Sequence, residues 1–321
     1  MKVSPSRLNT FLKCPQQYVL EYLQEERPPR VPFLPADFGT FVHEVIELVI
    51  KSPDENPIDI LSKKYVKVFG EDVYNSVQEY ADTYHSAVRD TLQHGETIGK
   101  SYRSPSMTNY FKFKHGDKLV NRYRAVLGHE AVDAYPFWDD AHRCLEYFLK
   151  WHSKYDGKLS MSEQKLEGVV LGYVGKEPVY FNGVIDFIHA GDDELLIVDF
   201  KTNSKPYDDA YISFSTQLGM YAVAGESFFG KLPRVGYLEL RQCKFTVKDV
   251  DEEELKRYKE FFNVVFKSMR KFEKAYAKHK AKGGSDDKFL ITYSDRFPVG
   301  SATTQGCPCN FLSSCIFKDK S

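Results

Sequence analysis

Two aspartates and a lysine stand within GVIDFIHAGDDELLIVDFKT, a segment that indicates two strands around a turn. With Gly191–Glu194 as the turn of an antiparallel hairpin, Asp186 lies opposite Asp199, about 5 Å apart at the β-carbons. Side chains alternate along a strand, so Lys201 points to the same face as Asp199. Two facing carboxylates repel each other unless a cation, a proton or a lysine lies between them. The hairpin therefore predicts a site that concentrates negative charge.

Two interpretations of this hairpin compete. A surface strand with a solvated ion pair accounts for the composition, but the neighbouring residues are apolar and favour burial. These neighbours are Ile185, Phe187, Ile188, Leu195, Leu196, Ile197, Val198 and Phe200. Charges at the end of a buried strand need a partner or a metal, and clustered carboxylate oxygens suit Mg²⁺ or Mn²⁺. Lys201 is then placed to position a metal-bound water or to stabilise charge on a phosphate.

The sequence GVID followed by VDFKT resembles the D…(D/E)-x-K signature of the PD-(D/E)XK nucleases. The surrounding motifs resemble the RecB/AddB-type branch, which includes the CRISPR-adaptation nucleases. The resemblance implies a metal-dependent deoxyribonuclease in which Asp186 and Asp199 bind Mg²⁺ or Mn²⁺ and the Phe200 carbonyl adds a ligand. It implies that Lys201 helps to generate or orient the attacking water.

The segment FGTFVHEVIE places Gly39, His43 and Glu47 on one stripe of an expected helix and resembles the family motif G-x-x-x-H-x-x-x-E. A lone helical histidine is usually structural, but the resemblance implies that His43 is a metal ligand. Gly39 would let the helix pack closely, and Glu47 would hold the second imidazole nitrogen. Glu163 stands where the family often has an acidic residue on the strand before the hairpin.

Downstream of the lysine, STQLGMYAVA places Gln217 and Tyr221 one helical turn apart. The pair resembles the family motif Q-x-x-x-Y, which implies contacts to the DNA backbone or to a flanking nucleotide. Ordinary packing is the alternative interpretation of these two residues.

Four cysteines frame the expected core: Cys14 near the start and Cys307, Cys309 and Cys315 near the end. They resemble the split set that holds a [4Fe–4S] cluster in AddB-like nucleases, which implies a structural clasp between the two ends of the chain. The C-terminal spacing is C-x-C-x5-C, one residue shorter than the usual family pattern. Tetrahedral Zn²⁺ and unrelated thiols are the alternatives. Cys144 and Cys243 are expected to be ordinary thiols.

A positive run lies in the charged helix expected from about Asp251 to Lys280. The candidate DNA-binding residues of this run are Lys267, Arg270, Lys271 and Lys274. Such a run is most often a solvated helix face. In a nuclease it is the best candidate for a surface that follows phosphates, with binding that weakens steeply as salt rises.

The whole chain of 321 residues is nearly neutral, with 44 Lys and Arg against 45 Asp and Glu. This balance excludes a protein that coats nucleic acid through bulk positive charge. No long apolar run or secretion signal is visible, so we expect a cytoplasmic protein without membrane contact. Glycine-rich loops of the nucleotide-binding type are absent from the sequence, which gives no support to an ATP- or NAD-driven activity.

The elements that must position these residues form an α/β (α+β) fold, a mixed central sheet with flanking helices preceded by a helical region. Ser4 is expected to cap a first helix that ends near Cys14, Asp37 is expected to cap the histidine-bearing helix, and strands begin near Ser162. Four regions are expected: N-terminal helices with the first cysteine and the histidine motif, a helical insertion, the nuclease sheet with its active site, and the basic helix with the C-terminal cysteines. Their bounds are 1–53, 54–160, 161–250 and 251–321.

These features favour a metal-dependent DNA nuclease, an exonuclease on single-stranded ends or flaps. A second hypothesis is a DNA-end-binding subunit of a recombination, repair or CRISPR-adaptation complex that cleaves poorly alone. A third is a zinc protein whose hairpin carboxylates are structural. A helicase, recombinase or adaptation partner is compatible with the first two hypotheses.

Overall fold

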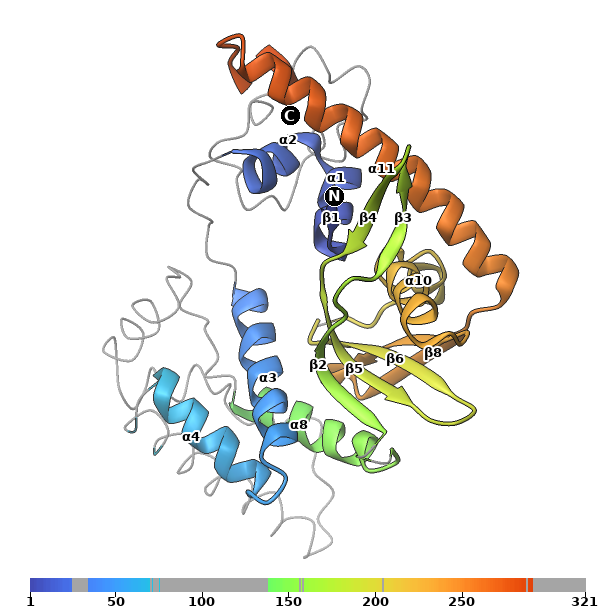
Figure 1. Ribbon diagram of the computed structural model, residues 1–321. Coiled ribbons are helices and arrows are strands. Elements are labelled where there is room, and N and C mark those ends of the chain that lie inside the picture. The colour runs from blue at the N-terminus through green and yellow to red at the C-terminus, as the bar shows by residue number, and fades with distance from the viewer. Residues whose placement is uncertain are drawn as a thin grey trace, which may run out of the picture.

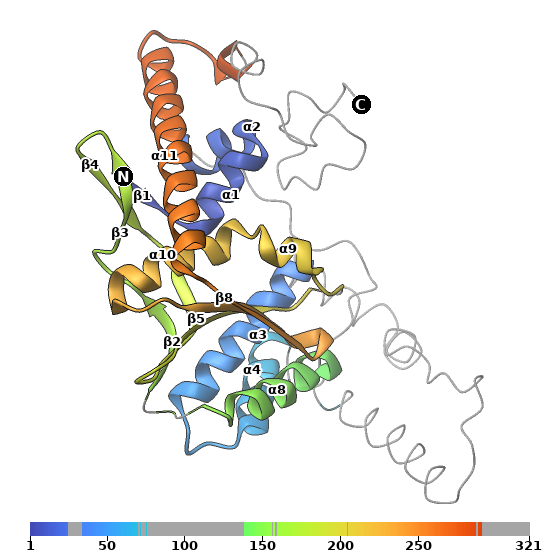
Figure 2. The ribbon, with the colours of Figure 1, turned by 90° about the vertical axis from the view of Figure 1, so that its right-hand side faces the viewer.

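Alternating apolar residues build the centre of a five-stranded sheet, seen edge-on in Figure 2. The computed structural model describes residues 1–24, 34–69, 71, 75, 138–155, 157, 159–203, 205–286 and 288–290. In spatial order the strands are β2 (Ser160–Lys165), β5 (Val184–Ala190), β6 (Leu195–Lys201), β7 (Arg234–Glu239) and β8 (Lys244–Asp249). Only β6 and β7 pair in parallel, so the sheet is mixed as predicted.

The predicted hairpin register is confirmed. Strands β5 and β6 pair Ala190 with Leu195 and Ile188 with Ile197. The ladder ends at the pair Phe187–Val198, one step before the two aspartates. Beyond this pair the Asp186 carboxylate takes part in place of a backbone group, accepting a hydrogen bond from the Phe200 amide at 2.6 Å.

Helices cover both faces of this sheet (Figure 2). One face carries α10 (Thr216–Phe229), α11 (Glu252–Lys280) and α1 (Pro5–Lys13), whose apolar residues share a core with Ile197. The other face carries α3 (Leu34–Lys51), α4 (Pro57–Phe69) and α8 (Trp138–His152), which share a core with Val198. The alternation of Ile197 and Val198 along β6 thus sends neighbouring side chains into two separate cores.

A second, three-stranded sheet lies beside the first (Figure 1). Its order is β1 (Lys2–Val3), β4 (Glu177–Phe181) and β3 (Val170–Val174), with β1 parallel to β4. The strand-rich segment after Ser162 therefore divides between two sheets, which strand propensity alone does not reveal. The pairing ties the beginning of the chain to its middle.

The N-terminal helices follow their capping signals. The Ser4 hydroxyl accepts a hydrogen bond from the Arg7 amide at 3.1 Å, and α1 ends at Lys13 with Cys14 as its C-cap, close to the predicted end. The chain continues through α2 (Pro15–Tyr18) into a π-helical turn at Val19–Leu23. The expected cap at Asp37 is wrong, because α3 already begins at Leu34. Asp37 therefore lies within the helix and not at its N-cap.

The remaining elements agree with the sequence pattern. Helix α9 (Asp209–Ser213) and α10 form the crossover between β6 and β7, and a 3₁₀ turn at Leu240–Gln242 joins β7 to β8. Asp251 caps α11, accepting a hydrogen bond from the Glu254 amide at 2.7 Å. Of the expected helical insertion, α4 and α8 pack with α3, and most of the segment between them lies outside the described residues. Within the described part of the chain, no helix combines the length and apolar character needed to cross a membrane.

Candidate active site

Three potential metal ligands converge at the end of the β5–β6 ladder. His43 comes from α3, Glu163 from β2 and Asp186 from β5, and one ligand atom of each lies within 4.8 Å of the other two. The set combines an imidazole nitrogen with carboxylate oxygens. It is the single group of this kind among the described residues.

Close packing of α3 brings His43 to this position. A β-carbon at Gly39 would lie 3.0 Å from the Thr202 hydroxyl oxygen, directly after β6. The His43 Nδ1 atom lies 3.5 Å from Asp186 Oδ1, and its Nε2 atom lies 3.2 Å from the Phe200 carbonyl oxygen. Gly39 was expected to allow close packing, and the structure identifies Thr202 as the residue that it packs against.

The electrostatic surroundings of His43 favour a positive charge. Burial lowers its pKa, but the hydrogen bond and charge of Asp186 outweigh burial and raise the pKa to about 9. Asp186 is itself held, because its Oδ2 atom accepts a hydrogen bond from the Phe200 amide at 2.6 Å. The site therefore attracts a cation, and a divalent ion would replace the proton of His43.

Glu163 takes an unusual backbone conformation. It lies between the pairs Ser162–Phe187 and Gln164–Ile185, a register that sets it opposite Asp186, and its φ of +49° is left-handed. Such a conformation costs roughly 1–2 kcal/mol for a residue with a β-carbon, and strained residues of this kind cluster at functional sites. Burial, aided by the charge of Asp186, raises the pKa of Glu163 to about 7. The sequence placed Glu163 only on the preceding strand, whereas the structure brings it into the ligand group.

Asp199 and Lys201 form a buried ion pair next to this group. The Lys201 Nζ atom lies 2.5 Å from Asp199 Oδ2, and Asp199 is 4% exposed. Burial raises the pKa of Asp199, while the ammonium opposes that rise. Burial alone would lower the pKa of Lys201, but the charge of Asp199 outweighs it and raises the pKa above its ordinary value. Lys201 is thus a cation in this site.

Residues Gln217 and Tyr221 of α10 complete the pair's surroundings. Asp199 Oδ1 accepts hydrogen bonds from Gln217 Nε2 at 2.7 Å and from the Tyr221 hydroxyl at 2.9 Å. Lys201 donates to Gln217 Oε1 at 3.0 Å. Both side chains were expected to contact DNA; the structure turns them toward Asp199. For Tyr221, which is 3% exposed, burial excludes that contact in this conformation.

These placements bring Asp186, Asp199 and Lys201 together as the hairpin pattern predicted, and they set His43 beside Asp186. The comparison with known protein families matches residues 2–315 to the PD-(D/E)XK nuclease superfamily. The chain belongs to this superfamily. A search of the curated proteins finds no match.

The ligand group of this PD-(D/E)XK protein fits a hard divalent cation. Carboxylate oxygens, which form most of the group, suit Mg²⁺ and Mn²⁺. Asp199 turns its oxygens to Lys201, Gln217 and Tyr221, so its expected role as a direct ligand stays a prediction. The Phe200 carbonyl, also expected as a ligand, faces His43.

One expected contact of the PD-(D/E)XK site is wrong. Glu47 was expected to hold the second nitrogen of His43, but the two ring nitrogens face Asp186 and the Phe200 carbonyl. Glu47 instead forms an ion pair with Lys51, one turn further along α3. The four-residue spacing that suggested the first contact also permits the second.

Sequence reasoning missed Tyr237. The Lys201 Nζ atom lies 5.1 Å from the centre of the Tyr237 ring, and this cation–π contact helps to hold the ammonium. Tyr237 pairs with Asp199 in the parallel ladder between β6 and β7. A prediction of how β6 pairs with β7 would have placed Tyr237 beside Asp199.

The cysteines of the described residues lie in three different places. Cys14 is buried between α1 and α2, where its sulfur accepts a hydrogen bond from the Gln17 amide at 3.4 Å. Cys144 is buried in α8, and burial raises the pKa of its thiol to about 12. Cys243 ends the turn after β7. Cys307, Cys309 and Cys315 lie outside the described residues, so the cluster stays a prediction.

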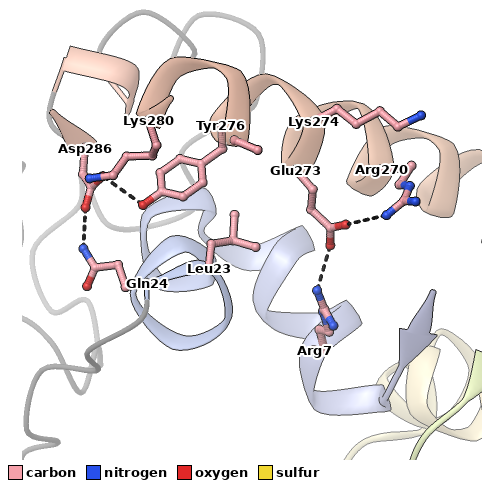
Figure 3. A pocket seen from close by; sticks show the side chains of 10 residues that line it. Arg7, Leu23, Gln24, Arg270, Glu273, Lys274, Tyr276, Lys280 and Asp286 are labelled. Carbon is pink, nitrogen blue, oxygen red and sulfur yellow. Dashed lines mark hydrogen bonds and ion pairs between the residues drawn. The ribbon is translucent and has the colours of Figure 1, made fainter. Parts of the chain in front are cut away.

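The basic helix is α11. Lys267, Lys271 and Lys274 are exposed on it, whereas Arg270 lies 2.9 Å from Glu177 in an ion pair. A cavity of about 790 Å³ opens between α11 and the N-terminal helices. Figure 3 shows that Lys274 extends at its edge, and among the described residues it has no acidic partner. These exposed lysines remain candidates for phosphate contacts.

Proposed function

We propose that this PD-(D/E)XK protein is a Mg²⁺- or Mn²⁺-dependent deoxyribonuclease that hydrolyses phosphodiester bonds. The observation that carries the proposal is the convergence of His43, Glu163 and Asp186 within 4.8 Å, next to the Asp199–Lys201 pair. Membership of a nuclease superfamily supports phosphodiester hydrolysis as the reaction at this site.

Some residues of the site would bind the metal, and others hold the reacting groups in position. His43, Glu163 and Asp186 would hold the metal, which when bound activates a water and neutralises phosphate charge. Lys201 keeps a positive charge and is fixed by Asp199 and Gln217, so it can donate to a phosphate oxygen or to the attacking water without reorganising. Tyr221 and Gln217 act on the reaction by holding Asp199 in place.

The proposed substrate is single-stranded DNA at ends or flaps, cut as an exonuclease. The exposed lysines 267, 271 and 274 of α11 support a local phosphate-binding surface on a chain whose overall charge is −1. Counterion release makes such binding weaken steeply with rising salt.

A [4Fe–4S] cluster held by Cys14, Cys307, Cys309 and Cys315 is part of the proposal, with Zn²⁺ as the less favoured occupant. The support is the buried position of Cys14 at the junction of α1 and α2, where a clasp between the chain ends would attach. Visible absorbance of an anaerobic preparation, lost in Cys14→Ser, would separate an iron–sulfur cluster from zinc.

The decisive experiment incubates purified protein with end-labelled single- and double-stranded DNA, with and without Mn²⁺. Shortening of the single strand only with Mn²⁺ is expected, and Asp186→Ala should abolish it. Asp193→Ala, which changes an exposed aspartate in the turn of the same hairpin, is the matched control. DNA binding without cleavage under either metal would instead favour the end-binding subunit.

A further inference from the structure

An exposed aromatic surface lies around α9, in the crossover that follows the active-site lysine. Phe214 is 84% exposed and Tyr211 is 51% exposed, although large apolar side chains are usually covered. Tyr207 is half-buried and stacks on Tyr211. We call Tyr207, Tyr211 and Phe214 the aromatic platform.

The two tyrosine rings of the aromatic platform are connected to the active site. Tyr207 and Tyr211 stack with centres 4.2 Å apart and planes 10° from parallel. The Tyr237 ring lies 5.3 Å from that of Tyr207 and 6.3 Å from that of Tyr211, and it contacts the Lys201 ammonium. Aromatic contacts thus run without a break from the surface to the residue proposed to contact the phosphate.

The platform is rigidly attached at its base. The Tyr207 amide donates to Glu239 Oε2 at 2.7 Å, and Glu239 is fully buried. Lys244 donates to the Tyr207 carbonyl at 3.0 Å. The Tyr211 amide donates to the Asp208 carboxylate at 2.6 Å, which caps α9. Binding a flat ligand on these rings therefore requires little further ordering.

We propose that the aromatic platform binds the bases of single-stranded DNA and leads the strand to Lys201. Unpaired bases offer flat faces that stack on aromatic side chains without sequence preference, whereas the bases of a duplex are already stacked on each other. The outer ring of Tyr211 continues the column of Tyr207, so a base placed there extends an existing stack. This inference rests on the proposed nuclease function and specifies how the enzyme selects single strands.

The test measures binding of the full-length protein to two fluorescent strands in the presence of EDTA, which prevents cleavage. One strand is oligodeoxythymidine, and the other is an abasic strand of equal length with the same phosphates. Tyr211→Ala and Phe214→Ala should each weaken binding of oligodeoxythymidine about tenfold, the size of one stacking contact. Binding of the abasic strand should not change.

Controls separate stacking from loss of structure. Tyr211→Phe keeps the ring and should bind like the wild type. Tyr173→Ala and Phe228→Ala remove rings of similar exposure, 55% and 52%, on β3 and at the far end of α10, and should also have no effect. Equal weakening on both strands, or no weakening on oligodeoxythymidine, would overturn the proposal.

A separate arm keeps this inference distinct from the proposed function. Mn²⁺-dependent cleavage by the wild type tests the nuclease activity, while the EDTA arm reports stacking even if no cleavage occurs. Absence of cleavage with base-dependent binding would refute the activity and retain the platform. Cleavage with base-independent binding would support the nuclease activity and refute the platform.

Discussion

At the scale of single residues, Lys201 is held from three elements. Asp199 of β6 lies 2.5 Å from its ammonium, Gln217 of α10 accepts its hydrogen bond at 3.0 Å, and Tyr237 of β7 offers its ring. The aspartates and the lysine were predictable because strand alternation places them on one face. Tyr237 was not predictable, and Glu163 was placed only on the preceding strand, without its left-handed backbone or its place in the ligand group, since these features depend on pairing between strands that are distant in sequence.

Lys201→Ala should lower the cleavage rate at least about a hundredfold, because it removes the positive charge next to the phosphate. It should also lower the free energy of unfolding by about 2 kcal/mol, because Asp199 is left buried without its cation. Single-turnover kinetics and urea unfolding measure the two effects.

The double variant Asp199→Asn/Lys201→Met is the control for that prediction. It should recover most of the lost stability, because no buried charge remains, and it should stay inactive. Full activity of Lys201→Ala, or a stability of Lys201→Ala equal to that of the wild type, would refute the assigned ion pair.

At the scale of elements, α3 must lie close to the end of β6 for His43 to reach Asp186. Gly39 permits this approach to Thr202. The motif of residues four apart indicated a close approach of the helix but not the residue that it approaches. The helix and the hairpin could be predicted separately from their apolar periodicities. Their contact could not, because no local pattern records which helix covers which face of a sheet.

Gly39→Ala separates packing from helix propensity. Alanine favours the helix by up to about 1 kcal/mol, so the variant should be no less stable than the wild type. Its β-carbon would press on the Thr202 hydroxyl oxygen, 3.0 Å away, and move His43, so cleavage should fall severalfold. Adding Thr202→Ala should restore cleavage. Unchanged cleavage in the single variant would show that α3 need not approach so closely.

At the scale of the whole molecule, α1 and α11 join the two ends of the described chain. Glu273 of α11 accepts hydrogen bonds from Arg7 at 2.8 Å and from the Tyr18 hydroxyl at 2.5 Å. Phe11 packs against Phe272 with ring centres 5.7 Å apart. The mixed sheet with flanking helices was predicted, but this closure was predicted only through the cysteines. The charged periodicity of α11 does not say which helix it meets.

Glu273→Ala should lower the free energy of unfolding by about 2 kcal/mol, since Arg7 and Tyr18 lose their shared acceptor. Glu260→Ala, an exposed glutamate on the same helix, should change stability by less than about 0.5 kcal/mol. Chemical denaturation compares the two variants. A similar effect of both would show that the contact does not join the ends.

The central claim is that His43, Glu163 and Asp186 form one divalent-cation site required for cleavage. The most direct test is Mn²⁺ titration followed by calorimetry, together with Mn²⁺-dependent cleavage, on the wild type, Glu163→Gln, Asp186→Ala and the control Asp193→Ala. The account predicts that Glu163→Gln and Asp186→Ala lose Mn²⁺ binding and cleavage together, while Asp193→Ala retains both. Undiminished Mn²⁺ binding and cleavage in Glu163→Gln and Asp186→Ala would contradict it.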